Sequence, residues 1–105
     1  MIKVIIERKV IPGAEKHYQR AVTNLLNEIE KAPGYISGET YHEINRPNRF
    51  IVIANWRSLD HWGRWLTSRQ RRQVVQEIAP FMEEEEKFIV LERQIYSLEE
   101  ESNAG

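Results

Sequence analysis

Apolar and polar residues follow one another along the chain in stretches that predict four strands and three helical segments. Residues 2–10 are rich in β-branched side chains and place apolar groups on both faces, which predicts a strand covered on both sides. Residues 35–44, 49–56 and 87–96 are the other predicted strands. Residues 45–48 favour a turn, so we expect the second and third strands to form an antiparallel hairpin.

Between the strands, apolar residues recur with helical spacing. Residues 14–31 carry them at i, i+3, i+4 and i+7, which predicts an amphipathic helix between Pro12 and Pro33. Ser58 and Ser68 are suited to cap two shorter helices that follow the third strand.

The resulting order, β-α-β-β-α-β with the second helical region in two pieces, is the ferredoxin-like α+β pattern of an antiparallel sheet with helices on one face. The helices bury only one face, yet the strands around Ile5 and Leu91 carry apolar residues on the other as well. A second copy of the sheet is the simplest cover, so we expect a homodimer through this face. Residues 1–97 are predicted to form one domain, and the acidic tail 98–105 is expected to be disordered.

Composition narrows the classes of partner. The chain has 105 residues, with 15 basic and 16 acidic side chains and a net charge of −1, which argues against a nucleic-acid-binding protein. The main basic cluster is followed by the acidic run 83–86, and it is predicted to be a solvated helical face; the entrance for an anionic ligand is the alternative. The cluster consists of Arg64, Arg69, Arg71 and Arg72.

The chain has no cysteine, which excludes disulfides, thiolate nucleophiles and cysteine-ligated metals. No stretch approaches the roughly 18 consecutive apolar residues of a membrane span, so we expect a cytoplasmic protein without membrane contact. The three histidines lie far apart without paired ligand spacing, and no metal site is expected.

Several short motifs resemble those of the antibiotic biosynthesis monooxygenase family. The run Val10-Ile11-Pro12-Gly13-Ala14-Glu15 resembles the V-x-P-G-x-E start of that family's first helix, and Pro33-Gly34-Tyr35 resembles the start of its second strand. Asn48-Arg49-Phe50, followed by Asn55-Trp56-Arg57-Ser58, resembles its third strand and the next helix start. These motifs lie in the family's order over residues 1–97. The resemblance implies a dimeric α+β barrel, in which each protomer keeps a pocket between its sheet and its helices.

The resemblance also implies an activity. Members of the family oxidise aromatic polyketides without metal or flavin, oxygenate quinols, or break down haem. We therefore expect a monooxygenase that needs no cofactor and acts on a small aromatic or quinol substrate. A non-catalytic dimeric barrel that binds a small hydrophobic ligand is the alternative.

Two polar residues are candidate catalytic groups. His42, on the second predicted strand, is a candidate general base, and deprotonating a phenol gives an anion that can pass an electron to dioxygen. A histidine hydrogen-bonded at the surface or dimer interface is the competing interpretation. Asn55 ends the third strand, where an amide near an apolar pocket can orient a phenol or quinone oxygen.

Five aromatic residues are the predicted substrate-binding set: Tyr41, Phe50, Trp56, Trp62 and Trp65. For Trp56 and Trp65, packing of helix on sheet is the competing interpretation.

Haem breakdown is a second, disfavoured alternative. That branch of the family relies on an Asn on the first strand, a Trp in the second helical region and a His three turns later; Glu7, Trp65 and Val75 stand at these positions. Glu7 and Arg8 place one charge on each face of the first strand, either paired or lining a cavity, and Arg93 is the expected partner of Glu7.

Overall fold

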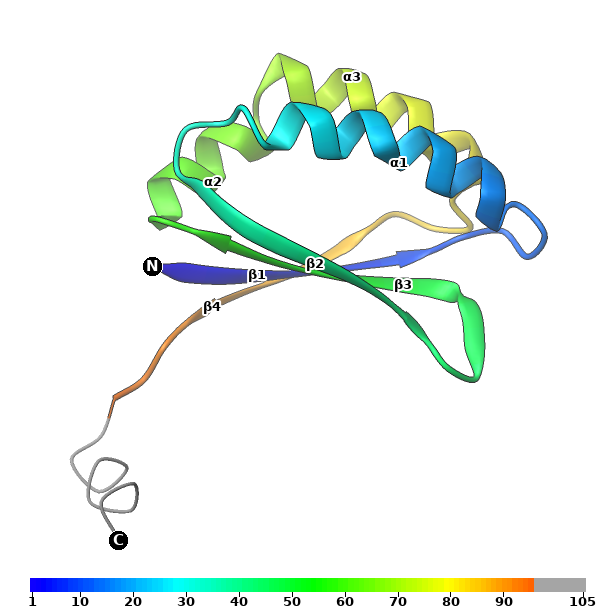
Figure 1. The fold of residues 1–105 in the computed structure, drawn as a ribbon, viewed down its shortest axis with the longest axis horizontal. Helices are drawn as coiled ribbons and strands as arrows, with labels where there is room; N and C mark the ends of the chain where they lie inside the picture. Colours follow the sequence, from blue (N-terminus) through cyan, green and yellow to red (C-terminus); the bar gives the residue numbers. More distant parts are fainter. Residues whose placement is uncertain (96–105) are drawn as a thin grey trace, which may run out of the picture.

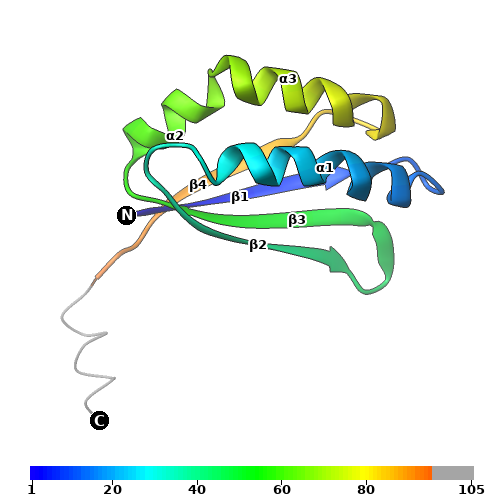
Figure 2. The ribbon, with the colours of Figure 1, turned by 45° about the horizontal axis from the view of Figure 1, so that its top comes forward.

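The computed structural model describes residues 1–95 as one antiparallel sheet with helices on a single face (Figure 1). The strands lie in the order β2-β3-β1-β4. They are β1 (Ile2–Lys9), β2 (Tyr35–Glu43), β3 (Arg46–Trp56) and β4 (Lys87–Glu92). The helices α1 (Glu15–Ile29), α2 (Leu59–Leu66) and α3 (Arg69–Ile78) all lie on the same side, as Figure 2 also shows. The predicted ferredoxin-like α+β fold is confirmed, and the predicted tail 98–105 lies outside the described residues.

Strict alternation along β1 separates the two faces of the sheet. Val4, Ile6 and Arg8 are buried beneath the helices, whereas their neighbours in sequence project the other way. Cross-strand partners in an antiparallel ladder point to the same side. Ile6 pairs with Val52 on β3 and with Phe88 on β4, so these side chains also face the helices.

The opposite side, here called the open face, is apolar along its middle. By the same register it carries Ile5, Ile51, Ile53, Ile89 and Leu91. No described helix or strand covers it (Figure 1). Within residues 1–95, no helix combines the length and hydrophobicity that a bilayer-spanning segment requires.

Aromatic packing fixes α2 on the sheet. Trp56, at the end of β3, is completely buried and meets Trp62 edge-on at 5.8 Å and Trp65 in a stacked contact at 6.4 Å between ring centroids. The Ser58 side chain accepts a hydrogen bond from the backbone N–H of His61 at 3.2 Å, and the Ser68 side chain accepts one from the backbone N–H of Arg71 at 3.1 Å. Both predicted N-terminal caps are therefore confirmed.

Two predicted element boundaries were wrong. The hairpin turn contains only Ile44 and Asn45, and β3 already begins at Arg46, because Asn48 is held to Val10, the residue that follows β1. The Val10 N–H donates to the Asn48 carbonyl at 2.8 Å, and the Asn48 amide donates back to the Val10 carbonyl at 3.0 Å.

The last strand is also shorter than the predicted 87–96. β4 ends at Glu92 because this residue pairs with Ile2, where β1 begins, and the described residues that follow, 93–95, have no partner strand. Tyr96, the last residue of the predicted strand, lies outside the described residues.

Gly34 is expected to be irreplaceable. Its φ is +85°, and an added Cβ would lie 2.2 Å from Cγ of His61. Gly34→Ala therefore combines left-handed strain with a steric clash, and we expect a loss of about 2–5 kcal/mol in the free energy of unfolding. Gly13→Ala is the matched control, since its φ is +94° but nothing lies within 4 Å of its Cβ position. That control should lose only about 1–2 kcal/mol. Urea unfolding measures the free energy of unfolding of both variants. Equal losses would contradict the predicted clash with His61.

Candidate functional site

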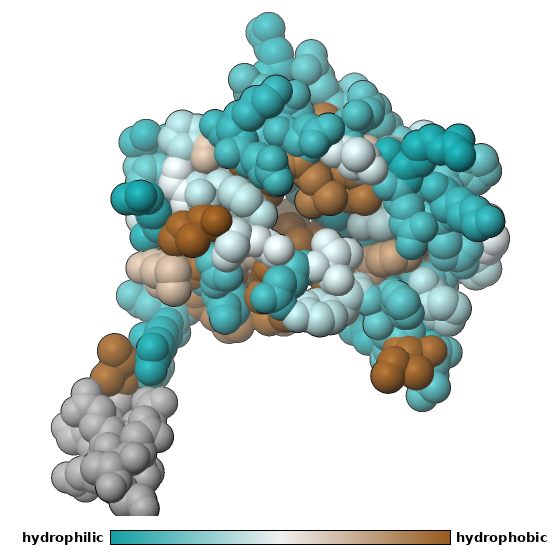
Figure 3. All heavy atoms as spheres, in the orientation of Figure 1, coloured by the Kyte–Doolittle hydropathy of each residue, from teal (hydrophilic) through white to brown (hydrophobic). Residues whose placement is uncertain are grey.

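A cavity of about 230 Å³, here called the helix-side cavity, lies between the sheet and the helices. Its apolar walls include Val22, Leu25 and Ile29 of α1, Val52 of β3 and Trp65 of α2. Figure 3 shows the surface hollowed between the helices and the sheet, with hydrophobic side chains in its depth. That this cavity is the predicted ligand pocket stays a prediction.

One phenol hydroxyl reaches into this cavity. Tyr35, the first residue of β2, packs edge-on against Trp56 at 5.4 Å between ring centroids. Its hydroxyl lies across Gly38, where an added Cβ would come within 2.5 Å of the oxygen. Burial raises the pKa of Tyr35, and the nearby Glu30 carboxylate raises it further. The hydroxyl is therefore protonated at neutral pH and can donate a hydrogen bond inside the cavity.

Two arginines and one glutamate form the most buried ionic contact of the described residues. Arg8 on β1 and Arg71 on α3 are 3% and 9% exposed, and both line the helix-side cavity. Arg8 Nε donates to Glu86 Oε2 at 2.9 Å, and a terminal nitrogen of Arg71 donates to Glu86 Oε1. Arg8 also donates to the Tyr18 hydroxyl at 3.1 Å. Two cations thus share a single carboxylate.

This arrangement lowers the affinity of the Arg71 guanidinium for its proton. Burial, and then the charge of Arg8, lower the pKa of Arg71 from its usual value to about 10. The group still carries its charge at neutral pH. Its guanidinium lies 5.3 Å from the ring centre of Phe88, whose face favours a cation.

The structure does not bring together the two predicted catalytic residues. His42 pairs with Phe50 and so faces the helices, but it is exposed and does not line the helix-side cavity. Asn55 pairs with Lys3 on the open face, where its amide donates to the Ser37 hydroxyl at 3.0 Å. The catalytic roles of His42 and Asn55 stay predictions.

The five predicted aromatic residues are also divided between different surroundings. Trp65 lines the helix-side cavity. Phe50, Trp56 and Trp62 are buried in the core, where Trp62 meets Phe88 at 5.5 Å between ring centroids. Tyr41 pairs with Ile51 on the open face and is 51% exposed.

Arg71 was predicted to lie on a solvated helical face, and this prediction was wrong because the residue is buried. A signal was present: Arg71 lies three residues before Val74 and seven before Ile78, which places it on the buried stripe of α3. Arg69 and Arg72, off that stripe, are exposed. Tyr35 carried no comparable signal, because its hydroxyl position depends on the path of β2.

The two charged residues near the end of β1, Glu7 and Arg8, face opposite sides, as predicted. Arg8 both pairs and lines a cavity, whereas Glu7 forms an ion pair on the other side with Arg49, not with the expected Arg93. Arg49 is placed to do so because its cross-strand partner is Lys9, two residues from Glu7 on the same face. Of the three positions tied to haem breakdown, Glu7 therefore lies across the sheet from Trp65.

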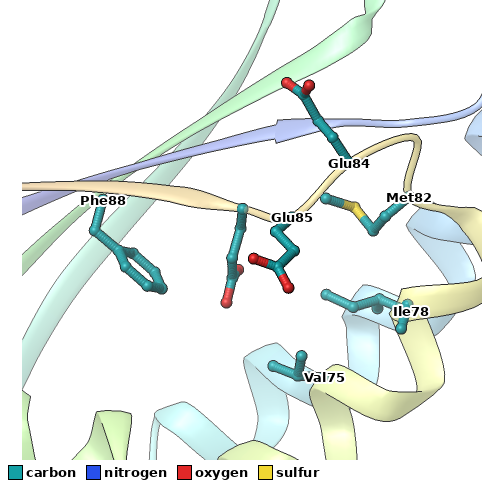
Figure 4. A pocket seen from close by; sticks show the side chains of 8 residues that line it. Val75, Ile78, Met82, Glu84, Glu85 and Phe88 are labelled. Atoms are coloured by element: carbon teal, nitrogen blue, oxygen red, sulfur yellow. The ribbon is translucent and has the colours of Figure 1, made fainter.

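A second hollow, of about 530 Å³, runs between α3 and the edge strand β4. Figure 4 shows Val75, Ile78 and Met82 on one side and Phe88 at the far end, with Glu85 pointing into the hollow and Glu84 away from it. It is open along the sheet edge and separate in its lining from the helix-side cavity. Among residues 1–95, no three His, Asp or Glu side chains are grouped as metal ligands would be.

Comparison with known proteins agrees with this architecture. A conserved protein from Methanosarcina mazei Go1 superposes with a TM-score of 0.81 at 16% identity, over 89% of this chain and 92% of that one. A candidate antibiotic biosynthesis monooxygenase from Bordetella bronchiseptica gives 0.81 at 17%, over 90% and 97%. SnoaB, a cofactor-independent oxygenase from Streptomyces nogalater, gives 0.77 at 14%, over 91% and 96%. At these identities the likeness establishes the fold.

Sequence comparison identifies the family. No curated protein matches the chain. The family model for antibiotic biosynthesis monooxygenase, however, matches residues 1–77, from β1 to the last turn of α3. The chain belongs to the antibiotic biosynthesis monooxygenase family.

Proposed function

We propose that this protein is a cytoplasmic, cofactor-independent monooxygenase that oxidises a small phenol or quinol in the helix-side cavity. The proposal rests on one observation: a chain of this family holds an apolar cavity that contains a protonated tyrosine hydroxyl and two guanidinium groups. Tyr35, Arg8 and Arg71 supply these groups.

The volume of the cavity suits a small aromatic substrate. An apolar cavity of about 150 Å³ holds one benzene molecule. The helix-side cavity, at about 230 Å³, thus suits one or two fused rings. Apolar walls on α1 and the sheet would exclude water from a bound ring, which protects a reactive intermediate.

The chemistry balances with dioxygen as the only co-substrate. A naphthol-type substrate loses its hydroxyl hydrogen and one ring hydrogen and gains one oxygen atom as a second carbonyl. The other oxygen atom leaves as water, so the four electrons lost by the ring are those gained by dioxygen. In this reaction the Tyr35 hydroxyl donates a hydrogen bond to the substrate oxygen and holds the ring in place.

The working unit in this proposal is a homodimer joined through the open face. Exposed apolar side chains support it, since Ile89 is 51% and Leu91 42% exposed there. They continue the apolar row of Ile51 and Ile53 across the sheet. Two such faces packed together would bury both rows.

A non-catalytic domain that binds a small aromatic ligand is the second candidate function. The observation in its favour is that no histidine lines the helix-side cavity and that His42 and Asn55 lie on opposite faces. Ligand binding without oxygen uptake would assign this function.

The first test is oxygen uptake with a panel of naphthols, quinols and anthrones. Tyr35→Phe removes the hydrogen bond to the substrate oxygen and should lower the rate roughly three- to tenfold. Tyr41→Phe is the matched control on the same strand, because its hydroxyl lies on the open face and donates to Glu39. Equal rates in the two variants would place the reaction outside the helix-side cavity.

The same assay decides the roles of His42 and Asn55. Loss of a general base typically lowers the rate roughly 10²- to 10⁴-fold, and His42→Ala should show this if His42 accepts the phenol proton. Asn55→Ala should lower the rate only if the open face takes part in the reaction. Unchanged rates in both variants would remove both residues from the mechanism.

The dimer is tested by sedimentation. Ile53→Glu places a charge in the middle of the open face, and we expect it to yield a folded monomer because burying unpaired carboxylates in a dimer interface is costly. Ile44→Glu is the control, since this residue is 91% exposed in the β2–β3 turn. A wild-type monomer, or a dimer that survives Ile53→Glu, would reject this interface.

A further inference from the structure

The buried charges around the helix-side cavity do not cancel. The charged residues that line it are Arg8, Glu30 and Arg71. Glu30 is an exposed residue that follows the end of α1, where water screens its charge. Deep in the wall, the two arginines share the single carboxylate of Glu86, so the buried cluster carries one excess positive charge.

The hydrogen-bonding capacity of the cluster is also unfilled. Each guanidinium has five N–H donors. Glu86 and the Tyr18 hydroxyl engage Nε and one terminal nitrogen of Arg8, and one terminal nitrogen of Arg71. Within residues 1–95 no other hydrogen-bond acceptor reaches the remaining donors, and both side chains form part of the cavity wall.

We propose that the ligand of this cavity carries an anionic oxygen group, a carboxylate or an ionised phenol, which binds Arg71 and Arg8 while its aromatic ring lies against Trp65 and α1. This inference rests on the proposed function and names the substrate class that it requires. A buried cation is costly unless it is paired, and a ligand anion supplies the missing partner. Low polarity around the cluster strengthens that attraction.

A cationic cavity also explains how the substrate can lose its phenol proton without a histidine nearby. No histidine lines it, yet the substrate must lose a phenol proton before it reacts with dioxygen. A neighbouring positive charge favours the ionised form of a hydroxyl and lowers its pKa. Two guanidiniums with one carboxylate therefore let the substrate bind as its anion, with the proton released to water.

Calorimetric titration with 2-naphthoate and 2-naphthamide tests this directly, because the two probes match in shape and differ in charge. The wild-type protein should bind 2-naphthoate roughly ten- to a hundredfold more tightly. Arg71→Gln leaves Arg8 and Glu86 as a neutral pair and should abolish this preference, because it weakens 2-naphthoate binding far more than 2-naphthamide binding. Arg72→Gln, at the exposed neighbour on α3, is the control and should keep the preference.

Glu86→Gln provides a test in the opposite direction. It removes the only carboxylate of the cluster, so the preference for 2-naphthoate should rise rather than fall. A structural role of Glu86 alone would lower the affinity for both probes together. Circular dichroism of each variant shows whether it is folded, and the wild-type comparison needs no variant at all.

The outcomes separate the two proposals. Equal affinity of the wild-type protein for both probes overturns the anionic substrate class but leaves an aromatic-binding cavity. A preference that survives Arg71→Gln, or that Arg72→Gln also removes, overturns the assignment to Arg71. Failure of both probes to bind rejects the cavity as a ligand site, and with it the proposed function.

Discussion

The contact of Arg8 and Arg71 with Glu86 joins three parts of the chain that are far apart in sequence. Arg8 lies on the central strand β1, Arg71 lies on α3, and Glu86 is the residue just before β4. Buried charges are tolerated only in paired arrangements, so each partner constrains the other two. The position of α3 over the sheet and the start of the edge strand both depend on this contact, and so does the cavity wall that the arginines form.

The register of β1 decides where this contact lies. A shift of one residue would turn Arg8 toward the open face and bring Glu7 under the helices, and every apolar side chain of the strand would change face as well. Val4 and Ile6 on the buried side oppose such a shift, since both would leave the core. The same alternation leaves Glu7 on the open face, where Arg49 pairs with it. The apolar pattern thus fixes the polar site as well as the core.

Features that depend on spacing within one helix or strand were predicted from the sequence, whereas features that depend on contacts between elements were not. The amphipathic stripe of α1 and the Ser58 and Ser68 caps depend on local spacing, and all were predicted. The ends of β3 and β4 depend on where a partner strand stops, which local propensity does not encode. The turn lies earlier than predicted for this reason, because Asn48 binds Val10, which follows a different strand.

The candidate site was only partly predictable for the same reason. Trp56 reads as a core residue, and strict alternation then places Asn55 on the other face, so this separation was present in the sequence. The side of His42 was not, because β2 changes register against β3 just beyond it. Tyr35 enters the cavity only because Gly38 leaves room for its hydroxyl. The distance between the Tyr35 hydroxyl and Gly38 cannot be derived from the strand periodicity of the sequence.

A cationic cavity suits the chemistry proposed for it at more than one step. The fixed charges of Arg8 and Arg71 are already in place before substrate binds, so stabilising an anion requires little reorganisation of the site. When an electron passes from a phenolate to dioxygen, the negative charge moves from the ring to superoxide within the same small volume. A cluster with one net positive charge stabilises the charge in either position, whereas a histidine base would become a cation only after it takes the proton. In the proposed reaction, the charges of the buried arginines thus take the place of a general base, because they favour the substrate anion before the reaction begins.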